Sequence, residues 1–417
     1  MGLAYIASYL RESGVDVSII DTTFRPDLEF VRARLVESQP EMVGIYCCTT
    51  MYGAATRISH MARRLSPYVV MGGPHASVAP ETLTNYADAV LVGEGELAMG
   101  SLLNHPKVGI IRAIPTGSLD SLPFPALDLL EVEKYIQNWY YLDSVNPKLR
   151  GLNMVASRGC PYRCTYCQPT LRHVFGPQFR SRSPENIVAE IKELRARYHI
   201  EALFFHDDTF GVEQSRTVRL CEMLREETPG LQWACNLRAD GLTPQMAAAM
   251  ASAGLRVVHL GIETASQRIL DEVYDKGIRL EQVRETLSRL REHHIRVLGF
   301  FMLGAPGETR QEIEATIRLA RRLPLHEATF SITTPLPGTH LAAGIAQGKD
   351  PPLAFNGYDY HTGGATCGTL SPGQLRRLQL KALLTFYLHP GRWGYIARHL
   401  TSPTGWRKFR RKLARFH

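Results

Sequence analysis

The feature that most constrains the fold of this chain is a repeated alternation of short apolar segments and amphipathic helical segments. Between residues 146 and 344 the alternation recurs six times, and each apolar segment has the length of a buried strand. Strands that are separated by helices pair in parallel, so the sequence predicts an α/β protein with a partial (β/α)6 barrel. The expected strands are 152–157, 202–208, 232–238, 257–263, 296–304 and 327–334, and the expected helices are 184–198, 213–226, 244–253, 266–272, 280–294 and 309–322.

A shorter series of the same kind occupies residues 1–105 and predicts an open parallel Rossmann-like sheet. Such a sheet usually begins with a strand, whereas the apolar periodicity here begins with a helix at residues 2–13. We therefore expect that the first strand is missing and that this domain is truncated at its N-terminus. The expected strands are 15–21, 42–50, 68–77 and 89–96, and the expected helices are 2–13, 29–37, 52–65 and 80–86.

Two further regions complete the predicted organisation. Residues 106–145 contain four prolines between weakly periodic segments and are interpreted as a linker. Residues 345–417 are interpreted as a C-terminal helical basic region, with helical periodicity at 372–388 and 392–415. From Tyr360 onward this region contains eleven Lys and Arg residues and no Asp or Glu, whereas the whole chain has a net charge of +8. The basic character of the chain thus belongs to its C-terminal region.

The composition is that of a globular protein rather than a membrane or disulfide-stapled protein. Hydrophobic residues make up 44% and charged residues 21%, and no run of 18 apolar residues occurs, so we expect neither a membrane span nor a cleavable leader. The cysteines outside one cluster are scattered, as is usual for reduced thiols. We expect a cytoplasmic protein. The segment 404–417 alternates aromatic and basic residues as an amphipathic helix, which predicts contact with the inner membrane surface unless the helix docks on the barrel.

Three cysteines, Cys160, Cys164 and Cys167, lie within eight positions directly after the first expected barrel strand, in the sequence CPYRCTYC. A structural zinc site normally takes four ligands, and paired C-x2-C motifs are absent, so zinc is the weaker interpretation. A [4Fe–4S] cluster normally takes four cysteines, so three thiolates would leave one iron open to another ligand. We interpret the three cysteines as the metal ligands and the catalytic centre of the chain.

The C-x3-C-x2-C motif resembles the signature of the radical S-adenosylmethionine (SAM) superfamily. This resemblance implies that the open iron binds SAM and that reductive cleavage yields a 5′-deoxyadenosyl radical. It also assigns SAM contacts to residues that end the following expected strands, where barrel active sites are built. Three of the positions also have a local structural interpretation: a helix cap for Asp208, pairing with Asp240 for Arg238, and a strand-to-helix turn for Gly304. The implied SAM contacts are Asp207, Asp208, Arg238, Glu263, Leu303, Gly304 and Pro306.

The first 105 residues resemble the cobalamin-binding domain of class B radical SAM enzymes. The similarity lies in the helix GLAYIASYL and in the segments MGGPHAS and VGEGE, each of which closes an expected strand. Without the resemblance, these glycine-rich strand ends would indicate only a weak nucleotide or phosphate site. No D-x-H-x-x-G motif occurs in residues 1–105, so cobalamin is expected without a histidine ligand. The implied cobalamin contacts are Thr49, Thr50, Gly72, Gly73, Pro74, His75, Gly93, Glu94, Gly95 and Glu96.

Together these similarities imply a cobalamin-dependent radical SAM methyltransferase that methylates an unactivated carbon of a small-molecule or lipid-like substrate. The implied cofactors are a [4Fe–4S] cluster, SAM and cobalamin, with an external electron donor of the flavodoxin or ferredoxin type. A radical SAM cyclase or rearrangement enzyme, for example one similar to the tetrapyrrole cyclases, shares this architecture and is the alternative. A tRNA-modifying enzyme is weaker, because such relatives carry an extra cysteine cluster, and we do not expect a nucleic-acid partner. A binding protein without turnover is disfavoured by the complete set of SAM motifs.

Overall fold

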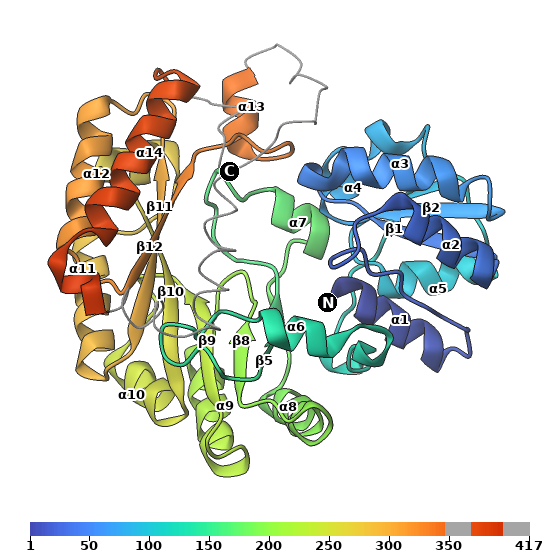
Figure 1. The fold of residues 1–417 in the computed structure, drawn as a ribbon, viewed down its shortest axis with the longest axis horizontal. Coiled ribbons are helices and arrows are strands. Elements are labelled where there is room, and N and C mark those ends of the chain that lie inside the picture. The colour runs from blue at the N-terminus through green and yellow to red at the C-terminus, as the bar shows by residue number, and fades with distance from the viewer. Residues whose placement is uncertain (347–367, 395–417) are drawn as a thin grey trace. The chain divides into compact units, whose positions relative to one another are not determined.

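The computed structural model describes residues 1–346 and 368–394 (Figure 1). These residues form two compact units, each of which is built around its own parallel sheet. Both units are discontinuous along the chain. Within the described residues, the first unit comprises 1–132, 159–180 and 336–346, and the second comprises 133–158, 181–335 and 368–394.

The first unit contains a four-stranded sheet in the order β1-β2-β3-β4, and all three strand pairs are parallel. The strands are β1 (Met42–Tyr46), β2 (Tyr68–Gly72), β3 (Ala89–Val92) and β4 (Gly109–Arg112). The helices before β4 are α1 (Gly2–Glu12), α2 (Leu28–Ser38), α3 (Tyr52–Ala62), α4 (Pro74–Val78) and α5 (Glu96–Asn104), with 3-10 turns η1 (Thr49–Met51) and η2 (Pro80–Leu83). The expected Rossmann-like α/β arrangement is confirmed.

Both faces of this sheet are covered, because successive strand residues point in opposite directions. Val69 and Met71 of β2 pack with α2 and α3 in one apolar cluster. Val70, between them, packs with α1 and α5 in another cluster on the other face. The continuous apolar run that predicted a buried strand at β2 therefore supplies two separate cores.

Two expectations for the first unit were wrong. Residues 15–20 form no strand; Val15 and Val17 pack against the cluster beneath α1 and α5, so their alternation reflects side-chain packing without sheet pairing. The expected linker contains β4, which pairs with β3 and extends the sheet to Arg112. The linker prediction failed there because four residues, GIIR, are too few to show periodicity. After β4 the chain forms η3 (Leu119–Ser121), η4 (Leu127–Leu129) and α6 (Val132–Asn138).

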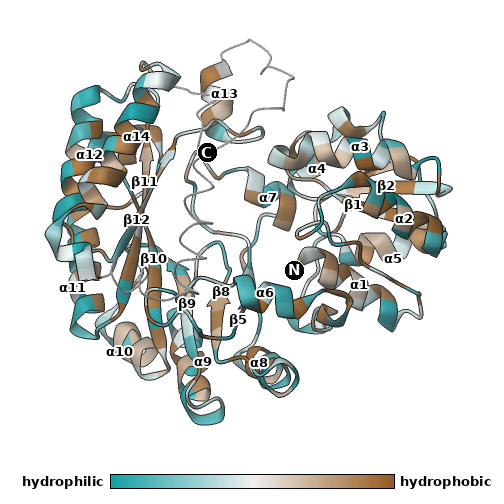
Figure 2. Ribbon diagram, viewed as in Figure 1, coloured by the Kyte–Doolittle hydropathy of each residue, from teal (hydrophilic) through white to brown (hydrophobic). Residues whose placement is uncertain are grey.

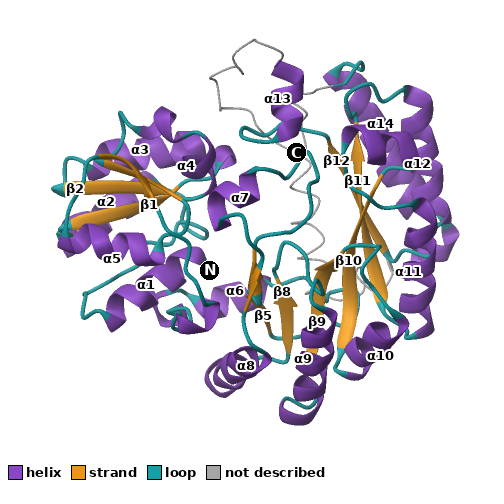
Figure 3. Ribbon diagram, turned by 180° about the vertical axis from the view of Figure 1, so that it is seen from behind, coloured by secondary structure: helices purple, strands orange, loops and turns teal. Residues whose placement is uncertain are grey.

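The second unit contains a six-stranded parallel sheet in the order β12-β11-β10-β9-β8-β5. Its strands are β5 (Gly151–Met154), β8 (Ala202–Phe205), β9 (Gln232–Leu237), β10 (Leu255–Glu263), β11 (Arg296–Leu303) and β12 (Glu327–Ile332). Its crossover helices are α8 (Pro184–Tyr198), α9 (Gln214–Glu227), α10 (Pro244–Ser252), α11 (Leu280–Glu292) and α12 (Arg310–Arg322), which lie along the outside of the strands (Figure 3). The predicted partial barrel is confirmed. Between β10 and α11 the chain forms a π-helical turn, Ile269–Val273, where an α-helix was expected.

Helix starts in the second unit follow capping rules. The side chains of Ser183, Thr243 and Thr309 accept hydrogen bonds from backbone amides of the first turns of α8, α10 and α12, and Pro184 and Pro244 occupy first helical positions. In Figure 2 the strands are mainly brown and hydrophobic, whereas α9, α11 and α12 carry teal hydrophilic stretches. The sheet is therefore positioned by amphipathic helices whose starts are fixed locally.

Residues 133–150, of which 133–145 fall in the expected linker, cover one face of the six-stranded sheet. Trp139 and Leu142 pack with Phe204 of β8 in one apolar cluster. Gly151 is required beneath Trp139, because a Cβ atom there would lie 2.3 Å from the indole ring. This part of the predicted linker is thus a component of the barrel core.

The remaining elements include one long helix and several short elements. They are β6 (Ser157–Arg158), which pairs with β7 (Arg180–Ser181), together with α7 (Thr170–Phe175), α13 (His340–Ala346), α14 (Pro372–Tyr387) and η6 (Pro390–Arg392). The first helix of the expected basic C-terminal region is present as α14, which packs on β12 and α12. The predicted amphipathic segment 404–417 lies outside the described residues. Across residues 1–346 and 368–394, no helix combines the length and apolar character needed to cross a bilayer.

Candidate active site

The predicted SAM contacts lie at or just after the carboxyl ends of β8, β9, β10 and β11. These four strands are neighbours in the sheet and run in parallel, so their carboxyl ends share one edge. Residues that are 100 positions apart in the sequence are therefore brought to one rim of the second unit. Active sites of barrel proteins are built at this rim.

Asp207 follows β8 and is buried, whereas Asp208 beside it is exposed. One Asp207 carboxylate oxygen accepts a hydrogen bond from the Ala156 amide at 2.7 Å, and the other accepts one from the Ser157 hydroxyl at 2.5 Å. Burial raises the pKa of Asp207 to about 6, although these two hydrogen bonds oppose the shift. The Asp207 side chain thus binds the segment Ala156–Ser157 just before the cysteine motif. The Asp208 carboxylate, in contrast, faces solvent.

The segment Val155–Ser157 is held by two arginines as well. Arg182 donates to the Val155 carbonyl at 3.0 Å from its side chain and to the Ala156 carbonyl at 3.0 Å from its amide. Arg216 bridges the two neighbouring segments of the chain by donating to the Ala156 and Arg182 carbonyls, at 3.0 and 2.7 Å. Glu190 lies 2.5 Å from Arg182 and is buried with it. We call this arrangement, residues 155–157 with Arg182, the neck of the cysteine loop.

Arg238 and Glu263 belong to a second polar cluster on the same rim. Arg238 makes two hydrogen bonds with Asp240, at 3.0 and 2.8 Å, and donates to the Lys276 carbonyl at 2.6 Å. The Lys276 ammonium forms a buried ion pair with Glu263, whose backbone has a φ of 67°. Sequence reasoning missed Lys276, since it lies 13 residues beyond Glu263 in an irregular segment. The anticipated Arg238–Asp240 pairing is present, and it fixes the guanidinium plane.

Leu303, Gly304 and Pro306 lie at the junction of β11 and α12. Leu303 is buried, and Gly304 has a φ of 84°, a conformation that favours glycine. The buried Glu308 carboxylate accepts hydrogen bonds from the amides of Gly304 and Ala305, at 2.6 and 3.0 Å. Burial raises the pKa of Glu308 to about 7, with both amide bonds opposing the shift. A carboxyl group therefore fixes the shape of this predicted SAM-contact loop from within.

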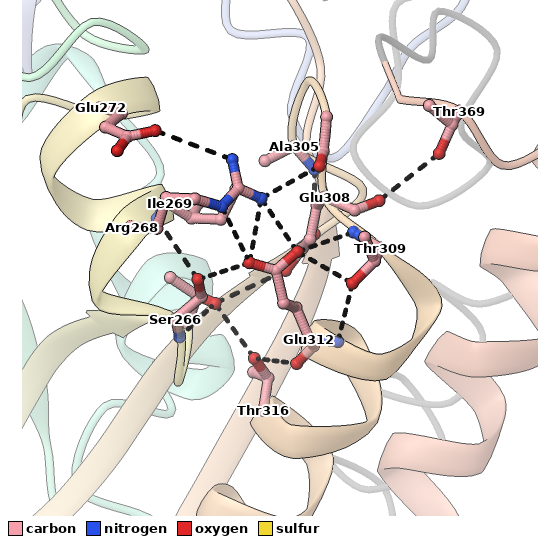
Figure 4. A network of polar contacts seen from close by, with 12 residues as sticks. Ser266, Arg268, Ile269, Glu272, Ala305, Glu308, Thr309, Glu312, Thr316 and Thr369 are labelled. Carbon is pink, nitrogen blue, oxygen red and sulfur yellow. Dashed lines mark hydrogen bonds and ion pairs between the residues drawn. The ribbon is translucent and has the colours of Figure 1, made fainter.

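Figure 4 shows how this loop is connected to the end of β10. The Glu312 carboxylate accepts hydrogen bonds from Arg268, at 2.9 Å, and from the Ser266 hydroxyl, at 2.7 Å. It also caps α12 through the Thr309 amide and hydroxyl, both at 2.9 Å. Although burial opposes it, these bonds lower the pKa of Glu312 to about 2. The β10 and β11 ends of the rim therefore form one hydrogen-bonded structure.

The cysteine motif lies in the loop between β6 and α7, which belongs to the first compact unit. Cys164 is buried, and Cys160 and Cys167 are partly exposed; none of them is in a disulfide. The amides of Cys167 and Gln168 both donate to the Cys164 carbonyl, at 3.0 and 2.9 Å, in one tight turn. The Gln168 side-chain amide donates to the Cys160 carbonyl at 3.2 Å. These bonds draw the three cysteine backbones together.

The donor set fits an iron–sulfur cluster better than a closed structural metal site. Three thiols in one short loop supply soft ligands, and a three-cysteine set leaves a fourth position for another molecule. In the described part of the chain no three Cys, His, Asp or Glu side chains already converge as a metal site. The spacing and the thiol chemistry, rather than a preformed cage, support the assignment of Cys160, Cys164 and Cys167.

At the carboxyl edge of the first sheet, His75 is fully buried and hydrogen bonded through both ring nitrogens. Nδ1 lies 3.1 Å from the Thr49 hydroxyl and Nε2 lies 3.0 Å from the Thr82 hydroxyl. Burial lowers the pKa of His75 to about 4, so the ring is neutral. The Thr50 hydroxyl lies 3.3 Å from the Cys48 thiol. His75 and Thr49 thus link the loops after β1 and β2.

The glycines after β2 are close to the protein's own backbone. Gly72 ends β2, and its carbonyl accepts a hydrogen bond from the Cys47 amide at 2.7 Å. Gly73 has a φ of 111°, and a Cβ atom there would lie 2.8 Å from the Cys47 carbonyl oxygen. Pro74 follows at the first position of α4. Gly73 is required for the close packing of these loops, and sequence reasoning had attributed it to ligand approach.

The loop after β3 contains Gly93, Glu94 and Gly95, followed by the buried Glu96 at the start of α5. Gly93 has a φ of 101°. The Glu94 carboxylate accepts a hydrogen bond from the Thr116 amide at 2.8 Å and forms a buried ion pair with Arg180 at 2.7 Å. Sequence reasoning missed Arg180, which lies 86 residues away at the end of the cysteine loop.

Two protein-family models match this chain. The model of the radical SAM superfamily matches residues 154–320, and the model of the B12 binding domain matches residues 1–103. The chain is 33% identical to "Uncharacterized methyltransferase PH0819" of Pyrococcus horikoshii over 94% of this chain and 88% of that protein. The chain belongs to the radical SAM enzymes that carry a B12-binding domain, and within them to the cobalamin-dependent methyltransferase family.

Two further relatives differ in what they do. The chain is 26% identical to the cytidylyl-2-hydroxyethylphosphonate methyltransferase of Streptomyces wedmorensis, over 82% of this chain and 76% of that protein. It is 28% identical to the anaerobic magnesium-protoporphyrin IX monomethyl ester cyclase of Rubrivivax gelatinosus, over 81% of this chain and 65% of that protein. Methyltransferases and cyclases are thus both similar to this chain.

Among solved structures, the fold resembles the radical SAM methyltransferase TsrM from Kitasatospora setae, a structure with cobalamin and a [4Fe–4S] cluster bound. The TM-score is 0.68 at 20% identity, and the similarity covers 83% of this chain and 71% of TsrM. This likeness confirms the fold class.

Proposed function

We propose that this enzyme methylates an unactivated carbon of a small-molecule or lipid-like substrate. The observation that supports the proposal best is the cysteine motif, which follows the first strand of a six-stranded barrel sheet in a chain that also matches a B12-binding domain. The methyltransferase relative that is similar over 94% of this chain supports the same reaction class. We further propose 1–105, extended by β4, as the cobalamin domain, 146–344 as the radical SAM barrel with residues 133–145 packed in its core, and 345–417 as a basic C-terminal region.

A bound [4Fe–4S] cluster, SAM and cobalamin would supply radical formation and methyl transfer. The part of the chain itself is binding, orientation and exclusion of water. Cys160, Cys164 and Cys167 would bind the cluster as thiolates. Their loop carries Gln168, which already holds the Cys160 carbonyl.

The rim of the six-stranded sheet would bind SAM. Asp208 is the exposed carboxylate available to the amino group, and Asp207 holds the neck behind it. Arg238 and Glu263 present opposite charges whose orientations are fixed by Asp240 and Lys276. Fixed charges of this kind need no reorganisation when a zwitterionic ligand binds. The Leu303, Gly304 and Pro306 segment would contact the adenine ring.

The carboxyl edge of the first sheet would bind cobalamin. His75 is neutral and its two nitrogens are hydrogen bonded, so it does not have a nitrogen to offer to cobalt without breaking the Thr49 or Thr82 contact. The chain therefore fits a cobalamin without a lower histidine ligand. The remaining proposed contacts at this edge are Thr49, Thr50, Gly72, Gly73, Pro74, Gly93, Glu94, Gly95 and Glu96.

The partners follow from the chemistry. A radical SAM enzyme needs a one-electron reductant, and we propose a flavodoxin or ferredoxin type of donor. The proposed contact of residues 404–417 with an anionic membrane surface rests on the sequence pattern alone.

Anaerobic reconstitution tests the proposal. The wild-type chain, supplied with iron, sulfide, SAM, hydroxocobalamin and a strong reductant, is expected to release 5′-deoxyadenosine. Cys160→Ala should lose the cluster absorption and all SAM cleavage, while Cys48→Ala, a partly exposed thiol in the same unit, should retain both. SAM cleavage that persists in Cys160→Ala would overturn the assignment of the cysteine motif.

A cyclase is the second candidate, and the similarity to the anaerobic cyclase of Rubrivivax gelatinosus favours it. The product mass separates the two reactions. A gain of one methylene unit, with the methyl group derived from SAM, indicates methyl transfer. A product without this gain indicates cyclisation or rearrangement.

A further inference from the structure

A buried ion pair joins two loops that the proposed function assigns to different cofactors. Glu94 lies in the loop after β3, in the proposed cobalamin edge, and Arg180 lies at the end of the cysteine loop. The Arg180 guanidinium makes two hydrogen bonds to the Glu94 carboxylate, at 2.7 and 3.0 Å. Only 3% of the Glu94 side chain and 11% of the Arg180 side chain are exposed. The charges are therefore paired away from water.

Backbone groups complete the arrangement on both sides. The Thr116 amide donates to Glu94 at 2.8 Å, and Arg180 donates to the Thr116 carbonyl. Arg180 also donates to the Phe175 carbonyl, at the end of α7, at 2.7 Å. One guanidinium thus ties together the loop after β3, the segment after β4 and the helix that follows the cysteines.

Other contacts in the same compact unit reinforce this connection. Helix α7 packs against α4, which follows the glycines of β2. A Cβ atom at Gly176 would lie 2.8 Å from the Pro115 ring. The amides of His340 and Leu341 donate to the carbonyls of Gln168 and Thr165, at 2.7 and 3.0 Å. The cysteine loop is thus packed within the unit that contains the proposed cobalamin edge.

The chemistry of the pair makes the connection strong and directional. A buried charge that loses its partner is strongly unfavourable, so the two loops separate only if both charges regain water. The planar guanidinium matches both carboxylate oxygens, and a lysine cannot reproduce that geometry. A shift of one loop is therefore transmitted to the other.

We propose that the Glu94–Arg180 pair couples the two cofactor sites, so that occupancy of the cobalamin edge changes the affinity of the cysteine loop for its cluster. This rests on the proposed function, which places a cofactor at each loop. Coupling between two binding sites is reciprocal, so cluster loading changes the affinity for cobalamin by the same factor. Glu94 and Arg180 act here as positioning residues.

The first test needs no cofactor. Hydrogen–deuterium exchange is measured on the full chain without cluster or cobalamin, for the wild type and for Arg180→Gln. The exchange rate of residues 93–96 should rise at least tenfold in Arg180→Gln, although the substitution is 84 or more positions away. Asp128→Asn is the matched control, because Arg11 of α1 and Asp128 of η4 form a two-bond ion pair elsewhere in the sequence of the same unit. It should leave residues 93–96 and 159–180 unchanged.

The second test measures the coupling itself. Binding of hydroxocobalamin is followed by absorbance on cluster-free and cluster-loaded protein. The two Kd values of the wild type should differ at least fivefold, the lower end of typical coupling. In Arg180→Gln the difference should fall below twofold. Arg180→Lys, which keeps the charge without the two-bond geometry, should give an intermediate value.

The outcomes separate the coupling from the proposed function. Wild-type protein that binds no cobalamin overturns the proposed cobalamin site, and the exchange experiment then still decides whether the loops are coupled. Equal wild-type Kd values with and without cluster, or unchanged exchange at residues 93–96 in folded Arg180→Gln, overturn the coupling. If Arg180→Gln does not fold, the double variant Glu94→Leu with Arg180→Met removes both charges together and is expected to fold without coupling.

Discussion

The two parallel sheets carry different groups at their carboxyl edges. Behind β1 and β2 of the first sheet the buried groups are neutral, with the His75 ring between two threonine hydroxyls. Behind β9 and β10 of the second sheet the buried groups are charged, with Arg238 held by Asp240 and Glu263 held by Lys276. The same type of sheet edge has thus been built from two kinds of chemistry.

The difference follows from what each edge can bury at low cost. A neutral hydroxyl or imidazole is accommodated once its hydrogen bonds are made, whereas a buried ion also needs an opposite charge. The second edge maintains paired ions, which suits a ligand with separated charges such as SAM. Behind β1 and β2 the first edge buries neutral groups, which suits a large ring held by shape, and the buried ion pair of this edge, Glu94–Arg180, lies beyond them, after β3. Three substitutions and one change of pH test how far this contrast extends.

The largest effect is expected from Lys276→Met in the charged edge. Removing the ammonium leaves the Glu263 carboxylate buried without its partner, which should lower the free energy of unfolding by about 3–5 kcal/mol. Urea unfolding followed by tryptophan fluorescence measures this change. Lys192→Met removes a lysine from an exposed pair with Glu227 and should cost less than about 1 kcal/mol. Equal effects of the two substitutions would show that the Glu263–Lys276 pair is not sealed from water.

The pH should affect the two edges in opposite directions. The pKa of His75 is lowered to about 4 from 6.5, so the unfolded chain binds more protons, and stability near β1 and β2 falls as the pH drops from 6.5. The pKa of Glu308 is raised to about 7 from 4.5, so the folded chain binds more protons, and stability near β11 falls as the pH rises from 4.5 through 7. Each shift corresponds to at most about 3 kcal/mol.

Hydrogen exchange between pH 4.5 and 7, corrected for the intrinsic rate, resolves the two regions. Glu308→Gln should abolish the pH dependence around β11 and leave that around His75 unchanged. A uniform response of both sheets would contradict the contrast between the edges.

A smaller effect is expected at the neck. Asp207→Ala leaves the Ala156 amide and the Ser157 hydroxyl without their acceptor, which should cost about 1–3 kcal/mol and raise hydrogen exchange at residues 155–158. Asp207→Asn keeps one acceptor oxygen and should cost less. Asp208→Ala removes the exposed neighbour and is expected to leave exchange at the neck unaltered. If both alanine variants loosened the neck equally, Asp207 would have no special role there.

The smallest effect belongs to the surface of the first unit. Asp128→Asn breaks the Arg11–Asp128 pair, whose side chains are 42% and 27% exposed, and should change the free energy of unfolding by less than about 1 kcal/mol. Glu94→Gln, in the buried pair of the same unit, should cost several times more. Comparable values in thermal unfolding would mean that burial does not distinguish the two pairs.

The sequence predicted the elements of the second sheet well, because three of the crossover helices, α8, α10 and α12, begin at side-chain caps. Ser183, Thr243 and Thr309 mark helix starts by local rules, and the apolar runs between them have strand length. The prediction failed where an alternating apolar pattern reflected side-chain packing and not sheet pairing. Val15 and Val17 alternate like a strand but pack without pairing. The strand β4 was missed because it is short and lies among prolines.

The candidate site was predicted as a set of strand-end positions, and the contacts among them were not predicted. Glu94 and Arg180 are 86 residues apart, and no spacing rule relates them. The same holds for Asp207 and Ala156, whose contact depends on strands β5 and β8 being neighbours. Sequence motifs show which residues lie at the carboxyl edge of a sheet. Contacts between elements that are far apart in the sequence depend on tertiary packing, and no local sequence pattern reveals them.

The discontinuous first unit has a consequence for how chains of this kind can be recombined. Residues 159–180 belong to the same compact unit as the N-terminal sheet, although they follow the first strand of the barrel along the chain. A crossover between residues 133 and 158 would join one parent's Glu94 loop to another parent's Arg180. Exchange of the N-terminal half as an independent cassette should therefore succeed only between parents that share the ion pair and its Thr116 contacts.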